Sequence, residues 1–273
     1  MVEAVVLGVV EGLTEFLPVS STAHIRITQS LLKQDLASEY WKMFAIVIQL
    51  GAILSVVVYF WRRLLQFVGT FLKGERGDRA WWHHPLSLVV ISFVVTAGPC
   101  FLIDKQIGEH LENFHMMAWA LIVGGGLMWA IDRRFSRQAT VTHMEDMSLR
   151  QAIVIGLAQI FAAAFPGTSR SMATIAGGQL MGLSRSTALE FSFFLSIPVM
   201  CAATGYKLLK FMLDSPSPMT TQQWTVLSIG FVVSFGVALA VIAWFMHWVR
   251  RHGFVPFAIY RIVAGLALLA SLY

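Results

Sequence analysis

The chain has 273 residues, of which 57% are hydrophobic and only 13% are Asp, Glu, Lys or Arg. Soluble domains carry about 25% charged residues, so this composition excludes an ordinary soluble enzyme, a disordered chain and a disulfide-stapled secreted module. The mean hydropathy of +0.69 indicates an all-α polytopic integral membrane protein. The net charge of +5 does not indicate nucleic-acid binding, because the basic residues cluster between apolar segments, as orientation signals do.

Residues 1–32 are apolar but are interrupted by the polar run Pro18-Val-Ser-Ser-Thr-Ala-His24. Each half is too short to cross a hydrocarbon core of ~30 Å, which needs roughly 20 helical residues. Two short helices joined by a polar, proline-containing break are typical of a re-entrant hairpin, which is tolerated at membrane depth only where it is buried in protein or lines a wet cavity. Three spanning helices are expected to follow, at 41–61, 86–103 and 115–131.

Residues 148–183 repeat this plan, with a break at Pro166-Gly-Thr-Ser-Arg-Ser171. Three further spans are expected at 186–212, 223–249 and 255–272, which makes six transmembrane helices and two re-entrant hairpins. The hairpins align at one offset of 148 residues: Gly8-Val-Val-Glu11 matches Gly156-Leu-Ala-Gln159, and Pro18-Val-Ser-Ser21 matches Pro166-Gly-Thr-Ser169. The prediction is a single membrane domain over residues 1–273, built from repeat 1 (1–135) and repeat 2 (148–273).

Loop charge sets the expected orientation. Basic residues gather in the loops at 62–84, 132–150 and 250–251, which lie on one side of the membrane if the spans alternate. The positive-inside rule places that side in the cytoplasm. Because each repeat has an odd number of spans, repeat 2 is inverted relative to repeat 1, and both termini are expected outside. Sites in such inverted repeats lie near the midplane, where broken helices meet.

The first hairpin carries two carboxylates, Glu11 and Glu15, on one face of its first helix. Carboxylates inside apolar segments usually face a cavity and mark function. Together they are suited to holding a divalent cation through oxygen ligands. Alternatively, one of them serves as a general base, or Glu15 forms only a structural cap or ion pair.

The break itself offers Ser20, Ser21, Thr22 and His24. One hydroxyl is expected to cap the second half-helix. Ser21 and His24 are three residues apart and are expected to meet as a nucleophile and a base, or His24 itself attacks phosphorus. A structural core histidine is the remaining alternative.

The second hairpin contributes Arg170 to the site. An arginine in so apolar a region needs an anionic partner, and its planar fork suits phosphate. Backbone N–H groups at a helix start extend such a cradle. The alternative is a ligand-free salt bridge from Arg170 to Glu15 or Glu11. The expected substrate-binding set around it is Thr168, Ser169, Ser171, Thr174 and Gln159, the last at the position that matches Glu11.

If the two breaks meet, these groups fit metal-assisted phosphoryl transfer, in which positioning and charge neutralisation do most of the work. The apolar surroundings indicate a substrate with a lipid tail and a phosphate head. The alternative is a flippase or transporter for a polyprenyl phosphate, because inverted repeats with broken helices are also a transporter plan. A transporter needs no nucleophile, so Ser21 and His24 favour the enzyme.

The motif Glu11-Gly-Leu-Thr-Glu15-Phe-Leu-Pro-Val-Ser-Ser-Thr-Ala-His24 closely resembles the first motif of the undecaprenyl-diphosphate phosphatase (bacitracin-resistance) family, and Pro166-Gly-Thr-Ser-Arg-Ser171 resembles its second. Further segments, Glu190–Pro198 and Phe254–Arg261, extend the resemblance over almost the whole chain. It implies a multi-pass enzyme of the bacterial inner membrane that hydrolyses undecaprenyl diphosphate to undecaprenyl phosphate and inorganic phosphate. That reaction recycles the lipid carrier for peptidoglycan synthesis and confers bacitracin resistance.

The resemblance also implies a site that opens toward the periplasm and uses a divalent cation, Mg²⁺ or Ca²⁺, at Glu11 and Glu15. It implies catalytic roles for Glu11, Glu15, Ser21, His24 and Arg170, with Ser20, Thr22, Ser169, Ser171 and Thr174 around them. Whether Ser21 or His24 attacks stays open, as does a homodimer. Ala23 and Met172 stand where the family usually has glycine; a side chain there strains the turn if φ is positive, and Met172 crowds the diphosphate if that group passes close by.

Overall fold

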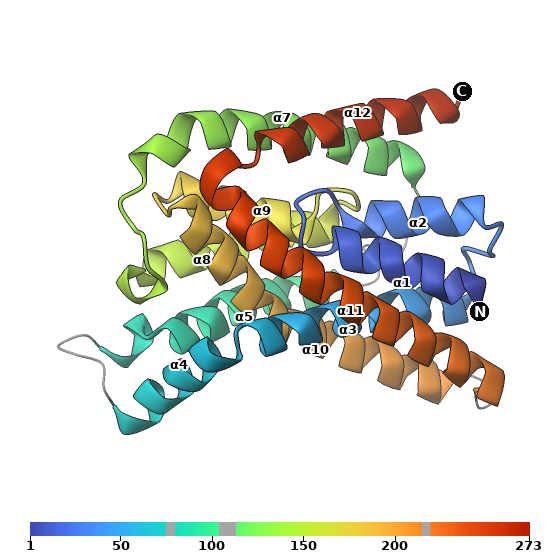
Figure 1. Cartoon of the computed structure of the whole chain (residues 1–273), viewed down its shortest axis with the longest axis horizontal. Coiled ribbons are helices and arrows are strands. Elements are labelled where there is room, and N and C mark those ends of the chain that lie inside the picture. Colours follow the sequence, from blue (N-terminus) through green and yellow to red (C-terminus); the bar gives the residue numbers. More distant parts are fainter. Residues whose placement is uncertain (75–79, 104–112, 215–218) are drawn as a thin grey trace.

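The computed structural model describes residues 1–74, 80–103, 113–214 and 219–273, and every named element in these ranges is a helix (Figure 1). The α-helices are α1 (Val2–Thr14), α2 (Ser21–Leu31), α3 (Glu39–Tyr59), α4 (Trp61–Lys73), α5 (Pro85–Leu102), α7 (Phe114–Phe135), α8 (Leu149–Ala164), α9 (Arg170–Leu180), α10 (Arg185–Asp214), α11 (Thr221–His252) and α12 (Val255–Ser271). Short 3₁₀ turns occur at Trp81–His83, Ser136–Gln138 and Met144–Asp146.

Five helices, α3, α5, α7, α10 and α11, are long and apolar enough to cross a membrane. They confirm five of the six predicted spans within one or two turns. The sixth prediction, 255–272, corresponds to α12, an apolar helix of 17 residues. The protein is thus an all-α multi-pass membrane protein.

The two predicted hairpins are the helix pairs α1–α2 and α8–α9. Their connections, residues 15–20 (break 1) and 165–169 (break 2), hold the first part of each polar run, and the runs continue into the first turn of α2 and of α9. Each break ends on a serine with a positive φ angle that caps the next helix: Ser20 has φ 74° and Ser169 has φ 73°. Each serine side chain accepts a hydrogen bond from the backbone N–H three residues on.

These caps correct the predicted alignment. Ser20 and Ser169 are 149 residues apart, whereas the uniform offset of 148 paired Ser169 with Ser21. The physical reason is that break 2 has one more residue between its proline and its cap than break 1. Arg170 therefore occupies the first helical position that Ser21 occupies in hairpin 1.

Each hairpin packs against the middle span of the other half of the chain. Helix α1 lies on α11, and α8 lies on α5. Gly8 allows the first approach, because a Cβ there would lie 2.7 Å from the carbonyl oxygen of Gly230. Gly156 allows the second, with its Cβ position 2.7 Å from the carbonyl oxygen of Ser92. This exchange brings both breaks to the middle of the molecule.

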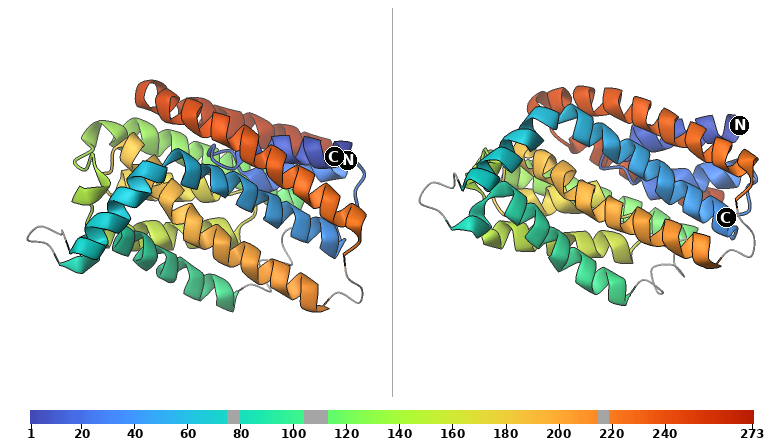
Figure 2. Two further views of the ribbon diagram at one scale, coloured as in Figure 1. Left: turned by 60° about the horizontal axis from the view of Figure 1, so that its bottom comes forward. Right: turned by 90° about the horizontal axis from the view of Figure 1, so that it is seen from below.

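The spans complete the bundle around the hairpins. Helix α10 packs on α3 and α5, and α7 runs along α12 (Figures 1 and 2). Both termini lie at the same end of the molecule (Figure 2). Two termini on one side of the membrane require this arrangement; which side they occupy stays a prediction.

The segment expected as a basic loop at 62–84 is instead largely helical, because α4 covers 61–73. Its apolar residues Leu64, Phe67 and Phe71 recur at helical spacing, and Phe67 is buried. The basic residues around this apolar pattern led to the prediction of a loop. Residues 75–79 of the predicted loop lie outside the described residues.

The main core surrounds break 1. Phe16 is fully buried in it, with its ring centroid 5.1 Å from that of Phe193 on α10. Burying such a side chain stabilises the fold by roughly 1.5–3 kcal/mol. The break is therefore held by packing as well as by its cap.

A buried ion pair lies at the C-terminal end of α7, at the start of the segment predicted as a loop at 132–150. Asp132 is fully buried and accepts two hydrogen bonds from Arg185, at 2.7 and 2.9 Å. It also accepts one from the Gln179 side chain at 3.0 Å and one from the Phe254 backbone N–H at 3.1 Å. This carboxylate ties the ends of α7, α9 and α11 to the start of α10.

Candidate active site

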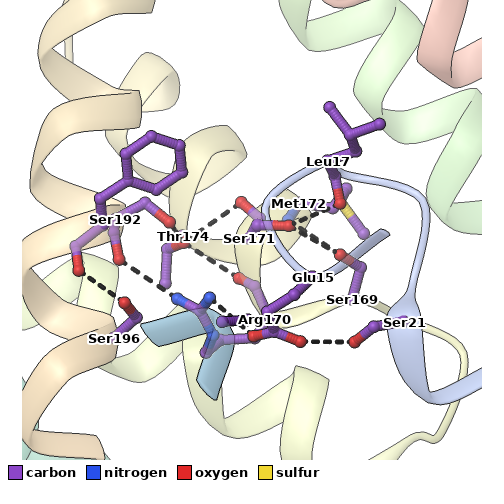
Figure 3. Close-up of polar contacts among 12 residues, drawn as sticks. Glu15, Leu17, Ser21, Ser169, Arg170, Ser171, Met172, Thr174, Ser192 and Ser196 are labelled. Carbon is purple, nitrogen blue, oxygen red and sulfur yellow. Dashed lines mark hydrogen bonds and ion pairs between the residues drawn. The ribbon is translucent and has the colours of Figure 1, made fainter. Parts of the chain in front are cut away.

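Glu15 links the two hairpins. It follows the last residue of α1, and its Oε2 accepts a 2.6 Å hydrogen bond from the Ser21 hydroxyl (Figure 3). Its Oε1 accepts a 3.1 Å hydrogen bond from Nη2 of Arg170, the first residue of α9. Glu15 and Ser21 are both buried. The predicted meeting of the two breaks is thus observed, and so is the ion pair weighed as a ligand-free alternative.

Arg170 is held on its other side by α10. Its Nη1 donates to the backbone oxygen of Ser192 at 3.2 Å. Its Nε is buried and has no hydrogen-bond partner among the described residues. A buried donor without a partner is costly, so this nitrogen is available to an anionic ligand.

The hydroxyls of the second hairpin divide into two groups. Ser171 donates to the backbone oxygen of Leu17 at 3.1 Å and is 3.0 Å from the Ser169 hydroxyl (Figure 3). Thr174 is 2.7 Å from the Ser192 hydroxyl and also donates to the backbone oxygen of Arg170. Ser171 and Thr174 are thus engaged in joining break 1, α9 and α10, whereas Ser169 faces a cavity.

That cavity has a volume of about 300 Å³ and lies between break 1, break 2, α3 and α10. Of the predicted residues, it is lined by Glu15, Ser20, Ser21, Thr22, Ser169 and Arg170. The predicted contact Thr168 lies in break 2 outside this lining. Gln159 lines a neighbouring, almost wholly apolar cavity of about 370 Å³ between α5, α8 and α10, which Arg170 also borders.

Three cations in the lining were not assigned to the site from the sequence. They are Arg26 on α2, Lys42 on α3 and Lys207 on α10. The sequence shows them as three basic residues far apart in the chain, and only the packing of the helices brings them to one cavity. Together with Arg170 they make it suited to a polyanion such as a diphosphate.

Glu11 lies one turn before Glu15 and is fully buried. Both of its carboxylate oxygens lack a hydrogen-bond partner within the described ranges, as do both polar atoms of the Gln159 amide. Glu11 is close enough to Glu15 and Arg170 to interact electrostatically. A buried carboxylate without a partner is strongly unfavourable unless a cation or a proton compensates it.

The donor set fits a divalent cation. Mg²⁺ is commonly held by one or two carboxylates together with waters and substrate phosphates. In the part of the chain that the structure describes, no group of three or more His, Cys, Asp or Glu side chains gathers to form a complete protein cage. Glu11 and Glu15 are the carboxylates that would hold such an ion, and of the two only Glu15 lines the cavity.

His24 does not meet Ser21, and this part of the prediction is wrong. Its Nδ1 is 2.7 Å from the backbone oxygen of Ser20, and its Nε2 is 2.7 Å from the hydroxyl of Tyr260 on α12. A carbonyl oxygen only accepts, so Nδ1 carries the proton and Nε2 accepts from Tyr260. Both nitrogens are thus engaged on the side of α2 that faces α12, and Ser21 pairs with Glu15 instead.

The two residues in place of the family glycines are unstrained. Ala23 and Met172 both lie within helices, and the positive φ angles fall on the preceding serines, Ser20 and Ser169. Met172 is buried in the main core rather than in the cavity lining. The expected strain and crowding are therefore absent at these positions.

Tyr260 and Arg261 were missed as neighbours of the site. Arg261 is fully buried and contacts both breaks through backbone oxygens. The signal was present, because an arginine inside an apolar span usually has a specific partner. The sequence does not indicate that the partners of Arg261 are backbone carbonyl oxygens of the two breaks.

Comparison with known proteins finds similar sequences over almost the whole chain. The family model described as "Bacitracin resistance protein BacA" matches residues 4–267. A protein of Koribacter versatilis named "Undecaprenyl-diphosphatase" is 55% identical over 98% of this chain and 96% of its own length. Proteins of the same name from Caldanaerobacter subterraneus subsp. tengcongensis and Rhizobium etli are each 42% identical, over 98% of this chain and 95% and 96% of their own lengths.

Proposed function

Because the chain belongs to the bacitracin resistance protein BacA family, we propose that it hydrolyses undecaprenyl diphosphate to undecaprenyl phosphate and inorganic phosphate. This reaction returns the lipid carrier to peptidoglycan synthesis and confers bacitracin resistance. The observation that carries the proposal is Glu15, which joins the Ser21 hydroxyl to the Arg170 guanidinium. A potential nucleophile, a base and an anion-binding group thus converge on one cavity.

The short Ser21–Glu15 hydrogen bond supports Ser21 as the nucleophile. In this mechanism the Ser21 oxygen forms a bond to the terminal phosphorus as its proton passes to Glu15. The bond from that phosphorus to the bridging oxygen breaks, and undecaprenyl phosphate leaves. The leaving undecaprenyl phosphate takes this proton from Glu15, which becomes a base again. Glu15 then deprotonates a water molecule whose oxygen bonds to the phosphoserine phosphorus. The bond from phosphorus to the Ser21 oxygen breaks, that oxygen takes the proton back from Glu15, and inorganic phosphate is released.

Charge neutralisation is the second task of the site. Arg170 holds non-bridging oxygens of the diphosphate through its free Nε and its fork, and the N–H groups at the start of α9 add to this cradle. Lys42 and Lys207 extend the positive lining. Glu11 and Glu15 would hold Mg²⁺ or Ca²⁺, which supplies further neutralisation of the diphosphate charge when bound.

We also propose the finer topology. The chain lies in the bacterial inner membrane as an inverted repeat, with its site open to the periplasm and both termini outside. Loop charge supports this orientation, and the shared end of the two termini is compatible with it. Helix α1 of repeat 1 packs on α11 of repeat 2, and α8 of repeat 2 packs on α5 of repeat 1. This reciprocal packing supports a two-fold relation between the repeats. A homodimer stays a prediction.

The test is phosphate release from undecaprenyl diphosphate by the purified protein in detergent, with EDTA or with added Mg²⁺ or Ca²⁺. We expect metal-dependent release that Ser21→Ala and Arg170→Ala abolish. Ser55→Ala is the matched control, since Ser55 is also a buried serine and its hydroxyl donates to the backbone oxygen of Ala52 within α3. No release by folded wild-type protein would overturn the proposal and favour a flippase or transporter of polyprenyl phosphate.

A further inference from the structure

Arg261 on α12 contacts both hairpin breaks at once. Its Nη1 donates to the backbone oxygen of Pro18 in break 1 at 3.1 Å. Its Nη2 donates to the backbone oxygen of Gly167 in break 2, also at 3.1 Å, and to that of Ala120 on α7 at 3.0 Å. The side chain is fully buried.

The two break carbonyls lie at equivalent places. Pro18 precedes Ser21 by three residues, and Gly167 precedes Arg170 by three residues. An interruption in a helix leaves such carbonyls without their usual backbone donors, and in an apolar environment each needs a replacement. One planar guanidinium satisfies both, which the single point charge of a lysine does not do with the same geometry.

The surroundings are shaped for this guanidinium. A Cβ on Gly124 of α7 would collide with Nη2 of Arg261. Gly126, two residues further along the same helix, has open space at its Cβ position. None of the ion pairs found among the described residues includes Arg261. The position of its guanidinium is therefore set by the hydrogen bonds to backbone oxygens and not by a carboxylate partner.

We infer that Arg261 is a positioning residue that sets the distance between the two breaks, and thereby the distance between Ser21 and Arg170. It does not line the cavity, so it acts on the reaction only through the groups that it holds. The catalytic consequence rests on the function proposed above; the effect on the distance between the hairpins does not.

The first test measures that distance directly. Spin labels are placed at Leu31→Cys and Leu180→Cys, two exposed positions at the far ends of α2 and α9, with Cys100 and Cys201 replaced by serine. Pulsed dipolar spectroscopy then compares otherwise native protein with Arg261→Lys and Arg261→Gln. We expect a broader distance distribution in Arg261→Gln and an intermediate one in Arg261→Lys.

The second test separates kcat from KM in phosphate release. Misplacing reacting groups by about 1 Å costs roughly 10²-fold in rate, so we expect Arg261→Gln to lower kcat by about that factor and to change KM much less. Arg63→Gln is the control, since Arg63 pairs with Glu145 and Glu190 at 2.7 and 3.2 Å, away from both breaks. It should leave kcat and the distance distribution unchanged.

A pair of glycine substitutions covers the case in which the Arg261 variants do not fold. Gly124→Ala displaces the guanidinium without removing it, whereas Gly126→Ala makes the same chemical change in open space. We expect only Gly124→Ala to broaden the distance distribution and lower kcat. Equal behaviour of the two alanine variants, or native distances in Arg261→Gln, would overturn the inference. If wild-type protein releases no phosphate, the proposed function fails while the distances still decide the role of Arg261.

Discussion

His24 and Tyr260 are hydrogen bonded across the interface of α2 and α12, with 2.7 Å between Nε2 and the hydroxyl oxygen. Their rings are also stacked, with centroids 5.6 Å apart. Because Nδ1 is bonded to the Ser20 backbone oxygen, this histidine connects the cap of break 1 to α12. Its position outside the lining of the cavity indicates that it holds the break in place.

Tyr260→Phe tests that role, since it keeps the stacked ring and removes only the hydroxyl. We expect a loss of about 0.5–1.5 kcal/mol in stability, the usual value of one hydrogen bond, and a decrease in kcat of less than tenfold. Thermal unfolding and phosphate release measure the two effects. A decrease of 10²-fold or more would instead indicate that the pair takes part in proton transfer, whose usual contribution is about 10²–10⁴-fold.

Glu15→Gln removes the proposed base and one proposed metal ligand in a single isosteric change. We expect kcat to fall by about 10²–10⁴-fold and the metal titration to move to higher concentration. Glu3→Gln, in the first turn of α1, the helix that ends just before Glu15, is the matched control. An unchanged metal titration would remove the proposed ligand role, and a kcat near the wild-type value as well would show that the carboxylate has only a structural role.

Lys207→Gln weakens the positive lining of the cavity without touching the groups around Ser21. We expect KM for undecaprenyl diphosphate to rise severalfold while kcat stays near the wild-type value, because the lysine contributes binding rather than chemistry. Added salt should reduce the difference between the two proteins. Lys210→Gln, which changes an exposed lysine one turn further along α10, should leave KM unaltered.

Met172→Gly tests whether the Met172 side chain crowds the substrate. Because Met172 is buried in the main core, we expect this change to leave a cavity and to destabilise the protein by about 2–5 kcal/mol, as buried methionine truncations do. Activity at a temperature where the variant stays folded should not increase. A gain in kcat/KM would mean that Met172 does crowd the substrate.

Much of the architecture was predictable because it depends on local patterns. Interrupted apolar stretches marked both hairpins, and α2 and α9 end within three residues of the predicted limits at 32 and 183. Continuous apolar runs located the spans. Helix α4 was missed because its arginines were interpreted as loop charge. The apolar residues at helical spacing, Leu64, Phe67 and Phe71, were too few to indicate a helix.

The sequence predicted which residues form the site better than it predicted which of them are in contact. Glu15, Ser21 and Arg170 do meet, as expected if the tips of the two hairpins come together. The partner of His24 and the partners of Arg261 were not predictable, because they depend on how α12 lies against residues more than ninety positions away in the chain. The one extra residue between the proline and the cap of break 2 became visible only through the φ angles of the two caps.

The packing of α1 against α11 has a consequence for biosynthesis. Hairpin 1 leaves the ribosome long before the helix that covers it, since chains are made and begin to fold from the N-terminus. A nascent chain that stops before Val255 already contains Glu11, Glu15, Ser21, His24 and Arg170, yet it lacks the helix that bridges the two breaks. The site can therefore assemble only after α12, the last helix, has been synthesised.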